Sequence, residues 1–410
     1  MNLFLLKLKK MKNLFIKTLC SIAILVYSKG ALAQTEAASF IRAGESDSKK
    51  LIGAYLQPIT KGLASSINDA WYSTAKPLGL FGFDIRFGFG ASIVNNDSKT
   101  YTLNGIGINS DPNGKFLLTP INGDRNTNQP TIVGDGNGSK LAVSALNPID
   151  NSRIYLDTIR SFSGTKSPVS LGAIPFIQAS LGLVKGTEIM FRMMPIQSGD
   201  FSSSGFGFGI KHSISQWIWC IEKLPIDISG IYTYNNNSLE YAFGNSFLDA
   251  DRNSANALAT NEYKNSQKLT ITSSGHQLGA IISKKLSFFT PYAGFTINRA
   301  TSQIAMKGIY PIQSIREKST GIYEKFNDNI TDPISFSNTV NSTRAAIGFR
   351  MKFVLFTFGA EYNHAFSADQ FNTFNATFAL NIQQLSPNFL QQNSNAVSYT
   401  HLTLPTNREV

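Results

Sequence analysis

Apolar residues alternate with small or charged residues along residues 81–94, FGFDIRFGFGASIV. The apolar positions are Phe81, Phe83, Ile85, Phe87, Phe89, Ala91 and Ile93. The residues between them are glycine, serine, Asp84 and Arg86. Successive side chains of a β-strand point to opposite faces. The stretch therefore predicts a long strand with one aromatic face and one small, charged face.

The same alternation recurs in much of the chain after residue 78, where no window of about twelve residues has a convincing helical period. The further alternating segments are Thr187–Pro195, Phe206–Ile214, Ile226–Tyr234, Ala345–Phe353, Val354–Tyr362 and Phe374–Ile382. Polar stretches separate them, the longest at 95–169, 235–267 and 311–341. We interpret these stretches as long loops, which are unusual in a compact soluble domain but common on one side of outer-membrane barrels.

The composition of the two faces separates a membrane barrel from a soluble sandwich, which also alternates. The polar faces are mainly glycine and serine with isolated charges, and the chain has 30 Phe but 3 Trp. Strands of about 9–11 residues suffice to cross a bilayer when tilted, and only a closed barrel satisfies their backbone hydrogen bonds there. The sequence predicts an all-β fold: a transmembrane antiparallel β-barrel of 12–16 strands, with 14 preferred. A secreted soluble β-protein is the alternative.

Residues 34–77 differ from the rest of the chain. Their apolar positions have helical spacing at Leu51, Ile52, Tyr55, Leu56, Ile59 and Leu63. Pro58 and Gly62 would kink or split this helix. We therefore expect one or two short helices that plug the lumen ahead of the barrel, which we place at 78–385. Trp71, Tyr72 and Pro77 are assigned to the plug and its hinge.

The two ends of the chain indicate export and an altered terminus. Residues 1–33 have a basic start, a short apolar core and the small-residue sequence ALA before Gln34, which predicts a signal peptide cleaved near Ala33. An uncleaved anchor is the alternative. Residues 386–410 are read as a tail, and within it VSYTHLTLPTNREV (397–410) resembles translated sequencing adapter. A genuine polar tail is the alternative there.

Charge and cysteine content exclude several classes of function. The net charge is +11, but residues 1–33 contribute six lysines and no acid, so +5 remains after cleavage. This is a weak basis for nucleic-acid binding, and we predict no nucleic-acid partner. Cys220 is the one cysteine left after residue 33, which rules out an intrachain disulfide and a cysteine-based zinc site.

Motifs that would suggest chemistry are incomplete. GFGFG (205–209) lies within an alternating strand and lacks the spacing of a dinucleotide fingerprint. GDGNGSK (134–140) resembles the start of a calcium loop but has no glutamate at its twelfth position. His364, Ser367 and Asp369 form no recognisable hydrolase pattern. We therefore predict no enzyme, no cofactor and no metal site.

Charged residues on the polar faces are the candidate functional residues. They are Asp84, Arg86, Glu188, Arg192, Lys211, Arg350, Lys352 and Glu361. In a closed barrel they would all project into one lumen. They would then form either a neutralising network that fills the barrel and holds the plug, or an electrostatic filter for a solute.

Three segments carry a resemblance to a known group of proteins. Residues 51–94, KGTEIMFRMMP (185–195) and FGFGIKHSISQW (206–217) resemble an uncharacterised family of Bacteroidota outer-membrane proteins. That resemblance implies an outer-membrane barrel and names no activity. The order of helices before the first strand is also similar to long-chain fatty-acid transporter barrels, although no substrate-site motif matches.

Passive transport of a hydrophobic or lipid-like solute through the plugged lumen is the leading functional hypothesis. The alternative is a structural, adhesion or binding protein in which the barrel anchors the insertion at 95–169. Both place the protein in the bacterial outer membrane. Both imply outer-membrane lipid and the barrel-assembly machinery as partners, and the first adds a hydrophobic small molecule.

Overall fold

The computed structural model describes residues 45–108, 116–146, 152–167, 169–170, 175–194, 196–198, 200–218, 224–242, 266–319, 322–367 and 371–382. The signal peptide, the tail from residue 386, Cys220 and Asp369 lie outside these residues. Predictions about them stay predictions.

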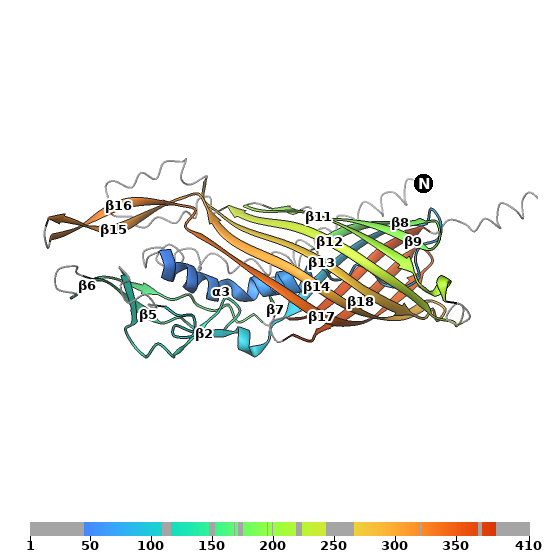
Figure 1. Ribbon diagram of the computed structural model, residues 1–410, viewed down its shortest axis with the longest axis horizontal. Helices are drawn as coiled ribbons and strands as arrows, with labels where there is room; N and C mark the ends of the chain where they lie inside the picture. Colours follow the sequence, from blue (N-terminus) through green and yellow to red (C-terminus); the bar gives the residue numbers. More distant parts are fainter. Residues whose placement is uncertain are drawn as a thin grey trace, which may run out of the picture.

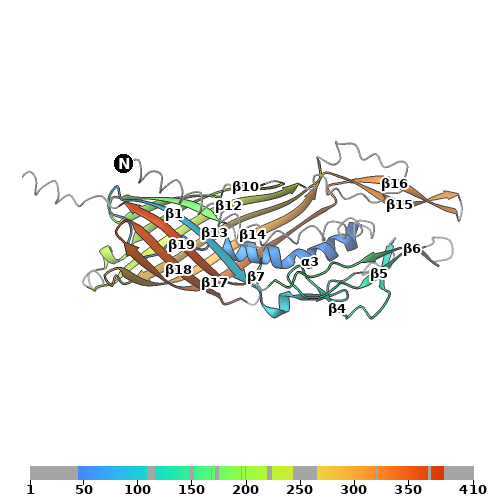
Figure 2. The same ribbon diagram turned by 180° about the vertical axis from the view of Figure 1, so that it is seen from behind.

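Ten antiparallel strands form a closed barrel (Figures 1 and 2). The ring closes because β1 pairs with β19 on one side and with β8 on the other. In order around the ring the strands are β1 (Phe83–Ile93), β8 (Phe176–Leu183), β9 (Thr187–Met193), β11 (Phe201–Ser213), β12 (Asp227–Ala242), β13 (Lys268–Ser283), β14 (Phe289–Lys307), β17 (Ile334–Phe353), β18 (Phe356–Ala365) and β19 (Asn372–Ile382).

The predicted count of 12–16 strands, with 14 preferred, is too high. Single strands are longer than a membrane crossing requires: β14 has 19 residues and β17 has 20. Much of the polar stretch 311–341, interpreted as a loop, is also strand. It forms β15 (Ile309–Ser319) and β16 (Ile322–Thr331), a separate hairpin, and the start of β17. Fewer strands therefore account for the length of the chain.

The insertion between β1 and β8 contains small sheets of its own. Strands β2 (Thr100–Thr102) and β4 (Asn128–Pro130) pair, and β3 (Phe116–Pro120), β5 (Lys140–Leu146) and β6 (Arg153–Arg160) form a second sheet. The short elements are η2 (Asn96–Ser98), β7 (Val169–Ser170), β10 (Ile196–Ser198) and η3 (Ser215–Trp217).

The outer face of the barrel carries an apolar band, and the inner face is polar. Exposed apolar residues of β13, β14 and β17 on this band include Leu278, Ile282, Phe295, Ile297, Ile347 and Phe349. On β13 the band lies between His276 and Lys284, about the length that a tilted membrane strand needs. Beyond His276 and its cross-strand partner Arg299, the outer face of these strands is rich in serine and threonine.

Short and long connections between the strands lie at opposite ends of the barrel. Short turns at 184–186, 284–288 and 354–355 lie at one end, which we call the turn end. The insertion, the end of β12, the start of β13 and the β15–β16 hairpin lie at the other, the loop end. No helix in the described residues is long and apolar enough to cross a membrane.

Helix α3 (Glu45–Ser66) begins at the loop end and points its carboxyl end into the barrel (Figures 1 and 2). It is one continuous helix of 22 residues despite Pro58. Leu51, Ile52 and Tyr55 are buried against the insertion and the ends of β14 and β17. Tyr55 stacks on Phe162 of the insertion, with 4.2 Å between ring centroids.

Candidate functional site in the barrel lumen

Residues 67–78, which we call the threaded segment, continue from α3 through the lumen to the start of β1. Near the loop end Asn68 donates to the backbone carbonyl of His276, and at the turn end the Leu78 amide donates to Glu188. Ala70, four residues beyond the last helical residue Ser66, has φ 57°, a left-handed conformation that is uncommon for a residue with a Cβ atom. The chain thus leaves helical geometry inside the lumen, because the last turns of α3 already contact the wall: Ser92 donates to the carbonyl of Gly62, and Arg344 to that of Ser65.

Lumen side chains bind the backbone of the threaded segment at Asp69 and Trp71. Arg86 and Gln178 both donate to the carbonyl oxygen of Trp71, each at 3.1 Å. Arg192 donates to the carbonyl oxygen of Asp69 at 3.0 Å. A buried non-helical backbone needs such partners because unpaired polar groups are costly away from water. The barrel wall supplies them from three strands.

The same kind of bonding continues to the turn end. Ser229 donates to the carbonyl oxygen of Ala75, and the Ala75 amide donates to Ser283 Oγ at 2.9 Å. The Leu78 amide donates to Glu188 Oε2, also at 2.9 Å. The segment is therefore held along its length by wall contacts to its main chain.

Two glycines of GFGFG make room for the buried side chain of the segment. Trp71 is fully buried. Its ring lies 3.0 Å from where a Cβ atom on Gly207 would stand and 3.1 Å from the same position on Gly209. A larger residue at either position would press on the indole. The glycines have a packing role here, in agreement with the interpretation that GFGFG lies within an alternating strand and is not a dinucleotide fingerprint.

Among the residues that the structure describes, three ion pairs are buried in the lumen, with side chains no more than 6% exposed. The Arg344–Asp69 pair, at 2.6 Å, ties the threaded segment to β17. Arg344 also donates to the carbonyls of Ser65 and Phe371. The other two pairs, within the wall, are Lys211–Glu188 at 2.9 Å and Arg86–Asp84 at 3.6 Å.

Aromatic rings enclose Arg192. Its guanidinium lies 4.1 Å from the ring centroid of Trp71 and 3.8 Å from that of Phe176. Gln178 accepts hydrogen bonds from the same guanidinium. A cation between two aromatic faces is stabilised by both ring quadrupoles, more strongly when water is excluded. This contact fixes the centre of the threaded segment against β8 and β9.

Glu361 binds the segment from the opposite wall. Its Oε1 accepts from the Ala70 amide at 3.3 Å, and Tyr292 donates to Oε2 at 3.1 Å. The ring of Tyr292 is in turn edge-on to Tyr72, with 5.7 Å between centroids.

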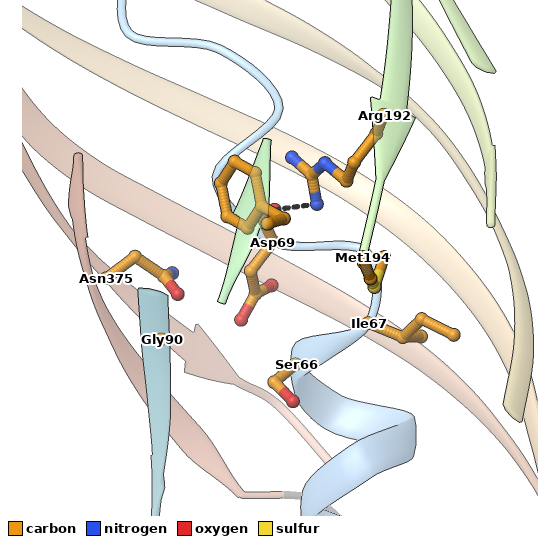
Figure 3. A pocket seen from close by; sticks show the side chains of 8 residues that line it. Ser66, Ile67, Asp69, Gly90, Arg192, Met194 and Asn375 are labelled. Carbon is orange, nitrogen blue, oxygen red and sulfur yellow. Dashed lines mark hydrogen bonds between the residues drawn. The ribbon is translucent and has the colours of Figure 1, made fainter. Parts of the chain in front are cut away.

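A small cavity lies beside the segment near the entry of α3. Figure 3 shows Arg192 pointing to the backbone of Asp69, with Asn375 and Ser66 on either side of the Asp69 carboxylate. The cavity measures about 20 Å³, room for roughly one water molecule. The segment is therefore closely packed against the wall at this level.

The sequence-predicted lumen residues all lie on the inner face of the barrel. Asp84, Arg86, Glu188, Arg192, Lys211 and Glu361 are buried around the threaded segment, and Arg350 is partly buried nearer the turn end. Trp71 and Tyr72 are buried within the threaded segment, and Pro77 is half-buried in it. Whether these charges act as a filter or as a structural network stays a prediction.

Sequence reasoning missed Asp69, Gln178 and Arg344. Arg344 has the same alternation parity as Arg350, so extending the predicted strand toward residue 334 would have found it. Gln178 lies in the alternating stretch FIQASLGL (176–183), which was not recognised as a strand. Asp69 was assigned to the helical plug, and no pattern distinguished its carboxylate from a surface one.

The motifs considered for chemistry gain no support from their surroundings. Asp135 of GDGNGSK pairs with Lys166 at 2.9 Å, and the hydrogen bond from Lys166 lowers the pKa of the Asp135 carboxyl. His364 is exposed on the outer face of β18, edge-on to Phe366. Among the described residues no group of three or more His, Cys, Asp or Glu could hold a metal ion.

The fold and the lumen define a transmembrane antiparallel β-barrel whose interior is occupied by a segment of its own chain. The chain belongs to a family of unknown function, DUF6588, which matches residues 11–382. The predicted resemblance to an uncharacterised family is confirmed at that level, whereas the Bacteroidota origin and the adapter origin of residues 397–410 stay predictions.

Similar solved structures are distant. They include the translocator domain of autotransporter NalP from Neisseria meningitidis, with 8% identity over 78% of this chain and 91% of that one, at a TM-score of 0.27. Ail from Yersinia pestis has 8% identity, covers 74% and 96%, and has a TM-score of 0.21. The COG4313 outer membrane channel from Pseudomonas putida F1 has 7% identity, covers 77% and 100%, and has a TM-score of 0.21. No curated protein matches the chain.

Proposed function

We propose that this protein is a bacterial outer-membrane protein whose closed barrel anchors a binding or adhesion module at the cell surface. The module consists of α3, the insertion strands β2–β6 and the β15–β16 hairpin. The observation that carries this proposal is the bonding of the threaded segment along the lumen, which makes the barrel a fixed support.

The module has the core that a folded unit requires. Buried residues of α3, of the insertion and of the strand ends contribute to one hydrophobic cluster: Leu51, Ile52, Tyr55, Leu103, Leu118, Leu141, Phe162, Met306 and Ile334 are among them. Such a cluster favours a defined surface over a set of independent loops. Because α3 belongs both to this core and to the lumen plug, the module is joined to the barrel by packing as well as by the chain.

The orientation supports surface display. In outer-membrane barrels short turns face the periplasm and long loops face the outside. The module lies at the loop end, so it would face the medium. Specific binding by such a module would use its irregular segments, which is where binding residues are commonly found.

Passive transport of a hydrophobic or lipid-like solute is the second candidate. It is favoured by one observation. The threaded segment is held in the lumen by non-covalent contacts, and its displacement would leave a channel lined by polar residues. In this mechanism the segment would have to give up its wall contacts in each transport event.

A disulfide lock separates the two proposals. Thr74 Oγ1 lies 3.1 Å from Ser283 Oγ, so Thr74→Cys/Ser283→Cys in a Cys220→Ser background places two sulfurs near bonding distance. We would measure conductance in planar bilayers and uptake of a fluorescent fatty acid into liposomes, oxidised and after reduction. The anchor proposal expects equally low flux in both states. Flux that appears on reduction and in the parent protein would overturn it in favour of transport. Deletion of 67–78, if the barrel assembles, is the positive control for an open lumen.

A further inference from the structure

A group of cations lies at the turn end of the lumen and exceeds the nearby acids. We call it the turn-end basic cluster: Arg86, Arg350, Lys352 and Lys285. Arg350 is within electrostatic range of Arg86, Asp84 and Glu188, and Lys352 of Arg350, Lys285 and Asp84. Of the two acids, Glu188 is already paired with Lys211 at 2.9 Å. Asp84 pairs through Oδ1 with Arg86 at 3.6 Å, so both nearby acids already face a cation other than Arg350.

Strand register explains why these side chains converge. Across the wall, Lys352 stands opposite Thr357, Thr357 opposite Ala379, and Ala379 opposite Arg86. In the neighbouring row Arg350 stands opposite Gly359. All of these residues face inward, and the residues between the cations are small. The long cationic side chains thus lie over the same patch of wall.

Arg350 is the exception among the lumen cations. Within the described ranges, each of the others donates a hydrogen bond: Arg86, Arg192, Lys211, Arg344 and Lys352. Arg350 makes no hydrogen bond or ion pair to any described residue, and its Nε is buried without a partner. A buried guanidinium nitrogen that lacks an acceptor is unfavourable, because its lost hydration is not replaced.

A second unsatisfied group stands in the same place. Thr357 Oγ1 is buried and has no hydrogen-bond partner, and it lies on β18 directly opposite Lys352. An ammonium, a guanidinium and a hydroxyl all donate hydrogen bonds. Arg350 Nε and Thr357 Oγ1 are therefore two buried donors without an acceptor, and they lie beside the Lys352 ammonium, which donates to Asn381.

We propose that the turn-end basic cluster is a binding site for an oxyanion of the phosphate class, reached from the turn end. The planar guanidinium fork matches the oxygens of phosphate, and Lys352 and Thr357 add single donors. The partial exposure of Arg350 and Lys352 opens the site to water on that side. The site does not rest on the proposed function, since it is formed by the wall and the turn at 284–288, and Arg86 of the cluster also binds the threaded segment. Free phosphate and a phospholipid headgroup both carry this chemistry.

Calorimetric titration of the full chain in a zwitterionic detergent tests the site. Inorganic phosphate and dioctanoyl phosphatidylglycerol are titrated separately at constant ionic strength in sodium chloride. We expect saturable binding of at least one, weakened tenfold or more in Arg350→Gln. Arg299→Gln, which removes an exposed arginine from the outer face of β14, is the matched control and should bind as the parent does.

The pattern of binding identifies the source of the anion. Binding of inorganic phosphate indicates a soluble oxyanion, and binding of the lipid alone indicates a headgroup. If Arg350→Gln fails to assemble, two milder variants replace it. Thr357→Val removes the unpaired hydroxyl, and Arg350→Lys keeps the charge but not the planar guanidinium. Each should weaken binding severalfold. Absence of saturable binding to both probes, or equal loss in the Arg299 control, would overturn the site.

Discussion

Removing the charge of Asp69 should destabilise the barrel more than removing any surface acid. The Asp69 carboxylate contacts Arg344 at 2.6 Å and accepts a hydrogen bond from Thr373, and both charged side chains are at most 3% exposed. Asp69→Asn keeps the shape but leaves the Arg344 guanidinium buried without a counter-charge. Breaking a buried pair on one side typically costs about 3–5 kcal/mol, against a net stability of about 5–15 kcal/mol for most proteins.

Urea unfolding in lipid vesicles, followed by heat-modifiable gel mobility, measures this effect. Glu240→Gln is the matched control, since Glu240 pairs with Lys268 at 3.1 Å while both side chains are 41% exposed. An exposed pair contributes about 0–1 kcal/mol. Asp69→Asn/Arg344→Gln should recover part of the loss, because the uncompensated charge is gone. A cost below about 1 kcal/mol for Asp69→Asn, equal to that of the control, would refute the reasoning that the segment is anchored by a buried charge.

Three further predictions address orientation, the membrane band and the module. An epitope inserted directly before Glu45 should be accessible to antibody on intact cells, because α3 begins at the loop end. Labelling only after permeabilisation would show that the barrel has the opposite orientation. Ile347→Arg, in the outer apolar band, should cost about 2–4 kcal/mol in vesicle unfolding, whereas Ser337→Arg, on the same face of β17 beyond the band, should cost little. Burial raises the pKa of Tyr101 to about 12, above its ordinary value of 10.0. Its contribution to stability should therefore be complete below pH 10 and lost as the pH rises through about 12, and Tyr101→Phe should remove that part of the pH dependence of unfolding.

Alternation together with the composition of the two faces was enough to predict the barrel and the direction of its faces. The period of two along residues 81–94 places Arg86 inside and Phe87 outside in any closed sheet with a polar lumen. The same rule puts Lys211 and Glu361, which are far apart in sequence, on the inner face, where both are buried. It depends only on local geometry, so it needs no knowledge of which strands are neighbours.

Strand count and the partners of each charge could not be obtained in this way. A serine- and threonine-rich part of a strand, such as residues 335–341, has a composition like that of a loop. The reason is that the outer face of this part lies beyond the apolar band and meets water rather than lipid. The pairing of Asp69 with Arg344 joins residues 275 positions apart. That pairing depends on how deeply α3 enters the barrel, and this depth is set by packing of Leu51 and Tyr55 on an insertion whose fold the sequence pattern does not specify.

The threaded segment enters the barrel from the loop end, and it therefore joins the module to the barrel as one mechanical unit. A plug that enters from the turn end could leave the lumen without disturbing the loop end. Here the segment is continuous with α3, and α3 contributes Leu51 and Tyr55 to the core of the module. Withdrawal of the segment would therefore have to break the Asp69–Arg344 pair and also move or unfold α3 against that core. The two costs add because the contacts are distant and share no partner. The architecture thus favours a lumen that stays closed. We therefore expect low flux in both states of the disulfide lock together with a large loss of stability in Asp69→Asn.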